Sequence, residues 1–202
     1  MNKSVFDLAA QANDVDAKII VALERVAAVF RAALWRVGKE YKLSPLQIQV
    51  LIFLKFHDLE KRKVSYLAKE FNLSKPTISE TVRTLLKKSL IEKEVDPVDT
   101  RSYSMHLTDQ GNQIVEAVSF FANDLKDGLT QWTKAEKVDF YQKLLSLIGS
   151  LQKSGLISVQ RTCQNCRFLT YQGEQPYCSF LKTDLRPEQW QIDCADFDLP
   201  LQ

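Results

Sequence analysis

The sequence predicts a mostly α-helical protein with a small β wing and a small four-cysteine module at its C-terminal end. Three observations lead to this prediction. Apolar residues recur at helical spacing through most of the chain up to residue 153. Two short strand-like runs near residue 95, joined by a turn-rich segment, interrupt that pattern. All four cysteines lie after residue 162, so we expect two domains, 1–154 and 155–202.

The composition is that of a globular protein, with 45% hydrophobic and 26% charged residues. No apolar run approaches the roughly 18 residues that span a bilayer, and the N-terminus lacks a secretion signal. We therefore expect a cytoplasmic protein. The net charge of +2 is unevenly distributed, because residues 61–107 hold ten basic and six acidic residues, whereas residues from 160 onward hold four and six. A basic middle indicates contact with a polyanion.

The helices of the first half are marked by spacing and by capping residues. Apolar side chains three and four positions apart predict a helix over residues 15–40. Ser44 and Pro45 then predict the start of a second helix, which runs to about Phe56. This helix is apolar nearly all round, as expected of a central buried helix. A short helix over 64–71 follows.

A helix–turn–helix, a hairpin and two longer helices are expected next. After a turn at residues 72–73, Ser74 is the predicted N-cap of a basic amphipathic helix. Strands are predicted over 91–95 and 102–107, joined by the turn-rich sequence DPVDTR. Amphipathic helices are predicted over 109–131 and 134–153, with Gly155 marking the end of the last one.

The order helix, short helix, turn, basic helix and hairpin is the winged helix–turn–helix plan. Such a helix fits the major groove of B-DNA, and its first turn can present polar side chains to base edges. The candidate DNA-binding residues in this helix and at the wing are Ser74, Lys75, Thr77, Ser79, Arg83 and Arg101. His57 and His106 lie in apolar or strand contexts, so we expect both to be structural.

The wing also carries a recognisable motif. The segment from Leu73 to Gly111 resembles the MarR family of bacterial transcriptional regulators, whose wing reads D-x-x-D-x-R, then a strand, then Leu-Thr-x-x-Gly. The matching residues of this chain are Asp96, Asp99, Arg101, Leu107, Thr108 and Gly111. The similarity covers about residues 15–153.

The resemblance to MarR regulators implies a homodimer in which the first helix and the last two helices entwine. It implies that Arg101 enters the minor groove while Asp99 steadies it, and that the helix from Ser74 reads the major groove. Two-fold symmetry predicts a pseudo-palindromic operator on double-stranded DNA. A small-molecule effector pocket is neither predicted nor excluded by the sequence.

The four cysteines, Cys163, Cys166, Cys178 and Cys194, have the spacing C-x2-C-x11-C-x15-C. A zinc ribbon normally supplies two C-x2-C pairs, whereas here the last two cysteines stand singly. Iron–sulfur clusters accept one pair plus isolated ligands, because their corners are further apart than the ligands of one ion. We therefore predict a [4Fe–4S] cluster, with a structural Zn²⁺ site and a thiol–disulfide sensor as alternatives.

The residues around the cysteines favour a shielded cluster. Six aromatic residues in this segment are predicted to exclude water from it, namely Phe168, Tyr171, Tyr177, Phe180, Trp190 and Phe197. The pattern C-x2-C-x-F, C and C-x-x-F is similar to the small high-potential-iron–sulfur-like modules that accompany some glycyl-radical enzymes. That resemblance covers only about residues 162–200 and implies a four-cysteine [4Fe–4S] site.

Together these observations predict a dimeric DNA-binding regulator whose affinity responds to redox, oxygen or iron status through a C-terminal cluster. One alternative is a regulator of small-molecule signals with a structural four-cysteine zinc site. Another is an electron-transfer or protein-docking module with secondary DNA binding. The sequence has no catalytic Ser/His/Asp set and no Gly-rich phosphate loop, so we predict that the protein is not an enzyme.

Overall fold

The computed structural model describes residues 4–95, 103–158 and 160–199. Asp96, Asp99 and Arg101 of the wing motif therefore lie outside the described residues. Within the described ranges the chain is mostly helical, with a two-stranded and a three-stranded antiparallel sheet. No described helix combines the length and the apolar character needed to cross a membrane.

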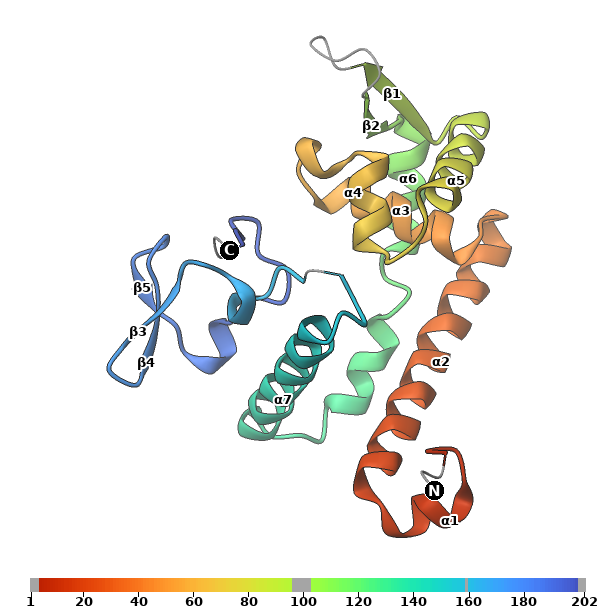
Figure 1. Cartoon of the computed structure of the whole chain (residues 1–202). Helices are drawn as coiled ribbons and strands as arrows, with labels where there is room; N and C mark the ends of the chain where they lie inside the picture. The colour runs from red at the N-terminus through yellow and green to blue at the C-terminus, as the bar shows by residue number, and fades with distance from the viewer. Residues whose placement is uncertain (1–3, 96–102, 159, 200–202) are drawn as a thin grey trace.

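The N-terminal half contains a long helix that leads into a compact winged domain (Figure 1). Its elements are α1 (Leu8–Asn13), α2 (Val15–Tyr41), α3 (Pro45–Phe56), η1 (Leu59–Lys61), α4 (Val64–Glu70), α5 (Lys75–Lys87), β1 (Ile91–Val95), β2 (Tyr103–Leu107) and α6 (Asp109–Val118). The predicted helices 15–40, 64–71 and the one after Ser74 are confirmed to within one or two residues. The predicted strands are confirmed as a hairpin in which Ile91 pairs with Leu107 and Val95 with Tyr103.

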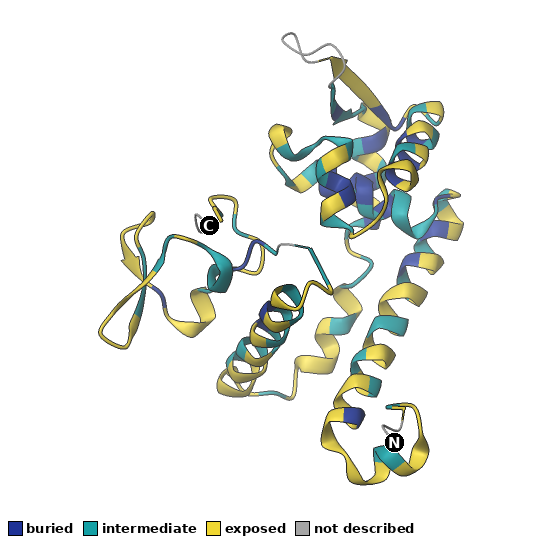
Figure 2. Ribbon diagram, viewed as in Figure 1, coloured by how far each residue is buried: buried dark blue, intermediate teal, exposed yellow. Residues whose placement is uncertain are grey.

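Helix α3 forms the centre of the winged domain. Ser44 caps it through a complete capping box, in which the Ser44 hydroxyl accepts the Gln47 N–H and the Gln47 side chain accepts the Ser44 N–H. Its buried residues are Ile48, Val50, Leu51, Phe53 and Leu54, and Figure 2 shows this buried centre between α4, α5 and α6. The nearly uniform hydrophobicity of this helix correctly predicted its central position.

One helix prediction is wrong. The expected helix over 109–131 ends at Val118, and residues Asn123–Leu129 form the 3₁₀ helix η2 instead. Tertiary contacts hold this segment against α2, because Phe121 packs edge-on against Phe30 with ring centroids 6.4 Å apart and Asp124 pairs with Arg36 at 3.2 Å. Asn123 and Asp124 are also poor helix formers, so the contacts with α2 outweigh the helical spacing.

The second half consists of one long helix and a small module without a large core of its own. Helix α7 (Lys134–Lys153) begins at the predicted residue and ends just before Gly155, whose φ of +74° is a conformation that suits glycine. The module contains η3 (Cys163–Asn165), β3 (Leu169–Gln172), β4 (Gln175–Cys178), β5 (Thr183–Asp184) and η4 (Pro187–Gln189). It lies beside α7 in Figure 1 and also reaches α4 of the winged domain.

Candidate DNA-binding surface and four-cysteine site

The first turn of α5 presents the predicted polar side chains on an exposed surface. Ser74 is the N-cap, and its hydroxyl accepts the Thr77 N–H at 3.3 Å. Ser74, Lys75 and Thr77 are exposed and Ser79 is half-buried, whereas Ile78 is buried against the core. The capped turn therefore fixes the positions of short donors and acceptors at the end of the helix that points away from the core.

Arg83 lies two turns into α5 and is exposed, but it is not a free cation. Its guanidinium forms an ion pair with Glu80 on the same face of the helix. The pair is solvent-exposed and one turn apart, so it contributes little to stability and separates at low cost. Asp99 and Arg101 are not described by the structure, and their roles stay predictions.

All four cysteines line one small cavity in the C-terminal module. The cavity has a volume of about 50 Å³ and its wall includes Cys163, Cys166, Cys178 and Cys194. Each of the four is half-buried and none forms a disulfide. One water needs roughly 15 Å³ of such space, so the thiols surround a hollow larger than a single water site. The structure thus brings together four residues that are up to 31 positions apart, since the first is residue 163 and the last is residue 194.

Backbone N–H groups donate to two of the four sulfurs. The Gln191 N–H donates to Sγ of Cys163 at 3.2 Å, and the Leu181 N–H donates to Sγ of Cys178 at 3.5 Å. Thiolates accept hydrogen bonds far better than thiols, and such N–H donors to sulfur set the potential of iron–sulfur clusters.

Burial opposes ionisation of two of the four thiols, Cys163 and Cys194. Burial raises the pKa of Cys163, and the neighbouring thiols add to this, although the Gln191 N–H acts in the opposite direction. Burial likewise raises the pKa of Cys194. A reactive thiolate is favoured by a lowered pKa, and neither Cys163 nor Cys194 has one. A positively charged metal group at the centre of the four sulfurs would reverse both shifts.

The described residues hold no group of three or more His, Cys, Asp or Glu side chains arranged to bind a metal ion. The four cysteines share a cavity wall, and the metal-binding tail expected from their spacing is not supported by this arrangement.

The aromatic shield is smaller than expected. Only Phe168 and Phe180 of the six predicted aromatic residues line the cysteine cavity, with ring centroids 5.1 Å apart. Tyr171 is 60% exposed, and Phe197 lines a different cavity. Aliphatic residues supply the rest of the apolar wall, namely Leu169, Leu181 and Leu185.

Sequence reasoning missed the residue that joins the module to the winged domain. Arg161 is 9% exposed, and its Nη1 and Nη2 donate to the two carboxylate oxygens of Glu70 on α4, at 2.6 and 3.1 Å. Its Nη1 also donates to the Tyr66 hydroxyl at 2.6 Å, and its Nε donates to Asp193 at 2.6 Å. The other carboxylate oxygen of Asp193 lies 2.7 Å from Nε2 of His57. We call these five residues the Arg161 network.

The network is only partly buried, since the Arg161 side chain is 9% exposed and that of Asp193 is 41% exposed. Burial alone would lower the pKa of Arg161, but hydrogen bonds and charges from Asp193 and Glu70 outweigh it and raise that pKa above its ordinary value. Burial alone would raise the pKa of Asp193, but Arg161 and His57 hold it below its usual range. His57 stacks on Phe53, with ring centroids 3.8 Å apart. No local pattern could have revealed the network, because Arg161 and Glu70 are 91 positions apart.

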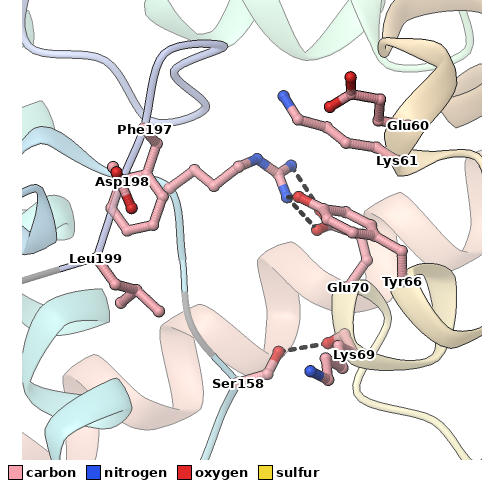
Figure 3. Close-up of a pocket in the computed structure, with 10 residues that line it drawn as sticks. Glu60, Lys61, Tyr66, Lys69, Glu70, Ser158, Phe197, Asp198 and Leu199 are labelled. Atoms are coloured by element: carbon pink, nitrogen blue, oxygen red, sulfur yellow. Dashed lines mark hydrogen bonds and ion pairs between the residues drawn. The ribbon is translucent and has the colours of Figure 1, made fainter. Parts of the chain in front are cut away.

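A second, larger cavity lies next to the Arg161 network. It has a volume of about 720 Å³, within the range of small-molecule sites. Figure 3 shows Tyr66 and Glu70 on one side of it and Phe197, Asp198 and Leu199 on the other. The Ser158 hydroxyl donates to the Lys69 carbonyl at its edge. The cavity is therefore formed jointly by α4 and the C-terminal module.

Comparisons with known proteins agree with the fold described above. Residues 41–102 match the model of the MarR family. The chain is 25% identical over 138 residues to the uncharacterized HTH-type transcriptional regulator YsmB of Bacillus subtilis, covering 68% of this chain and 93% of that protein. It is 27% identical over 117 residues to YhbI of the same organism, covering 56% and 74%.

Among solved structures, the chain resembles S. aureus MepR in its DNA-binding conformation, with a TM-score of 0.60, 24% identity, and coverage of 66% of this chain and 98% of that one. It also resembles the S. aureus MepR–DNA complex, with a TM-score of 0.59, 23% identity, and coverage of 65% and 96%. These matches show a winged helix–turn–helix fold, and residues 41–102 carry the similarity to the MarR family. None of the four cysteines lies within the residues that match the family model.

Proposed function

We propose that this protein is a dimeric transcriptional regulator of the MarR type that binds pseudo-palindromic double-stranded DNA. The observation that supports this best is the capped, exposed first turn of α5, which presents Ser74, Lys75 and Thr77 away from the core. Polar side chains in that position can contact base edges, while basic residues contact phosphates. Arg101 of the wing is proposed to enter the minor groove, with Asp99 steadying it.

The exposed apolar surface of α2 supports a dimer. Seven large apolar residues of this helix are between 40% and 65% exposed, namely Val15, Ile19, Ile20, Val26, Val29, Phe30 and Trp35. Figure 2 shows that most of α2 is exposed and that it extends away from the winged domain. A monomer rarely exposes so long an apolar stripe, so we propose that a second copy of the chain covers it.

The four-cysteine module is proposed to bind a [4Fe–4S] cluster through Cys163, Cys166, Cys178 and Cys194. The shared cavity, its apolar wall and the backbone N–H donors to sulfur support a cluster of this kind. When bound, such a cluster would supply a group that changes with redox, oxygen or iron status. The chain itself would supply the thiolates, would line the site with the apolar side chains of Phe168 and Leu185, and would tune the sulfurs through hydrogen bonds.

The first experiment is anaerobic purification followed by an absorption spectrum and by iron, sulfide and zinc analysis. We expect a brown protein with about four irons and four sulfides per chain. Cys163→Ser should lose that colour, whereas Ser79→Ala should keep it. A colourless wild-type protein with one zinc per chain would overturn the cluster assignment.

The second experiment measures the affinity of loaded and metal-depleted dimers for an operator selected from random duplex DNA at fixed salt. A coupling of about 1–3 kcal/mol corresponds to a change of roughly 5- to 150-fold in affinity. Equal affinities would refute regulation by the module while leaving DNA binding intact. Failure to select any duplex would refute the DNA-binding proposal itself.

A second candidate keeps DNA binding but makes a small organic molecule the signal, with a structural Zn²⁺ in the module. The cavity of about 720 Å³ between α4 and the module favours it, because the cavity combines aromatic and charged walls. In this second candidate, the zinc bound by the cysteines only stabilises the fold of the module and does not regulate DNA binding. The metal analysis above separates the two candidates.

A further inference from the structure

We infer that Arg161 is the positioning residue through which the four-cysteine module sets the placement of α4, the first helix of the helix–turn–helix. The inference rests on the proposed function, since it names the route by which the module would regulate DNA binding. It concerns a residue outside the matched family region and outside the candidate DNA-binding and cysteine residues.

The first step is that the Arg161 network joins two specific places. On one side, Arg161 makes a two-pronged contact with Glu70, the last residue of α4, and a third contact with Tyr66 on the same helix. On the other side, it binds Asp193, which immediately precedes Cys194 in the chain. The planar guanidinium can fill both roles at once because its donors form a rigid fork.

The second step is that backbone hydrogen bonds also connect Arg161 to the cysteine segment. The carbonyl of Arg161 accepts the Cys194 N–H at 3.0 Å, and Thr162, between Arg161 and the first cysteine, is fully buried. The Cys163 N–H in turn donates to the Gln191 carbonyl at 3.2 Å. A change in the position of Cys194 is therefore transmitted to Arg161 through both its backbone and its side chain.

The third step is that α4 and α5 are packed against each other and joined by a short turn. Their connecting turn is short, with Asn72 at a φ of 52° and the Leu73 N–H bonded to the Ala68 carbonyl at 2.9 Å. Leu67 of α4 and Ile78 of α5 are both fully buried in the same core. A displacement of the Glu70 end of α4 thus reaches the capped first turn of α5 directly.

The test substitutes a cysteine of the module and measures the hydrogen-exchange rates of the α4 backbone amides in the full-length protein. Cys194→Ser should speed exchange of the α4 amides by roughly fivefold or more in the wild-type background. In an Arg161→Met background the same substitution should change α4 exchange much less, because the side-chain contacts of Arg161 with Tyr66 and Glu70 are already lost. Where Cys194→Ser fails to fold, Cys178→Ser on β4 takes its place.

Three further variants locate the contact. Glu70→Gln removes the charge on the α4 side, and Asp193→Asn removes it on the module side, so each should reduce the response, by less than Arg161→Met does. Arg161→Lys keeps the charge but loses the fork, so it should not restore the response. Arg167→Met is the matched control, because Arg167 lies in the same module and pairs with Asp198 at 2.9 Å without contacting α4. It should keep the full response.

The outcomes separate this inference from the proposed function. If module-dependent DNA affinity persists in Arg161→Met, or if α4 responds equally in both backgrounds, the inference is overturned and the proposed function stands. If α4 responds only in the presence of Arg161 but DNA affinity never changes, the inference holds and regulation of DNA binding by the module is refuted.

Discussion

Gly111→Ala should destabilise the protein even though alanine is the better helix former. Gly111 lies in the first turn of α6, where a Cβ atom would be 2.0 Å from the carbonyl oxygen of Leu90 and 3.0 Å from its carbonyl carbon. Real Cβ contacts essentially never fall below 3.0 Å. Both atoms belong to the backbone that leads into β1, so no side-chain rotation relieves the clash. The helix and the strand have to separate by about 1 Å, the difference between 3.0 and 2.0 Å.

The size of the effect follows from what that separation breaks. Overpacking of this kind costs about 1–3 kcal/mol. The Leu90 carbonyl also accepts the Thr108 N–H at 3.2 Å, a hydrogen bond worth about 1 kcal/mol. We therefore expect a loss of about 2–4 kcal/mol, against the gain of up to about 1 kcal/mol that helix propensity alone would give. For a chain of this length the melting temperature should fall by about 5–15 °C.

The assay is thermal unfolding followed by circular dichroism at a fixed protein concentration, because dimerisation makes the melting temperature depend on concentration. Gly128→Ala is the matched control, since its Cβ would meet nothing within 4 Å. That substitution should be neutral or stabilise by about 0.4–1 kcal/mol. A Gly111→Ala protein that melts at or above the wild-type temperature would show that the contact between α6 and the start of β1 does not require glycine.

Further predictions concern a cap, the DNA surface and a titration. Ser44→Ala should lower the free energy of unfolding by about 1 kcal/mol, because it removes the capping box of α3, and urea unfolding measures this. Arg101→Ala should weaken binding to all duplexes and reduce the slope of log affinity against log salt concentration by about one, and an unchanged slope would contradict its role. Thr77→Ala should instead alter base preference, and a uniform loss of affinity over all duplexes would contradict its role. Hydrogen bonds from the Thr133 N–H and hydroxyl lower the pKa of Glu136. Their contribution to the stability of the folded state is therefore present above the pKa of the unfolded chain, and it is lost as the pH falls through the lowered pKa of the folded protein. Thr133→Ala should move that pKa back toward its ordinary value in a carboxyl NMR titration.

The parts of the fold that sequence reasoning predicted well depend on local signals. The N-caps Ser44 and Ser74, each followed by a proline in the first turn, define the starts of α3 and α5 in both the sequence and the structure. The hairpin and the start of α7 are likewise set by residues close in sequence. Capping and turn chemistry act over three or four residues, so their effects can be read without knowing the rest of the fold.

Tertiary contacts decide the parts that were not predicted. The break after Val118 depends on Phe30 and Arg36 of α2, which hold Phe121 and Asp124 from about 90 positions away. The three-stranded sheet of the module and the Arg161 network depend on contacts between residues that no local pattern pairs. Cysteine spacing suggested the common site, but only the fold brings the four side chains to one cavity.

Under the proposed function, the position of the module would allow a small change in it to affect how a dimer binds two half-sites. Besides its contacts with α4, the module binds α7, where the Tyr141 hydroxyl donates to the Trp190 carbonyl at 2.8 Å and the Gln152 side chain accepts from Asn165 at 2.7 Å. In the proposed dimer, α7 belongs to the dimerising part and α4 to the DNA-reading part. The angle between these two parts sets the separation of the two α5 helices, which has to match half-sites about 34–36 Å apart. Because the module contacts both parts, a local shift in the module would directly change the separation of the two α5 helices in the proposed dimer.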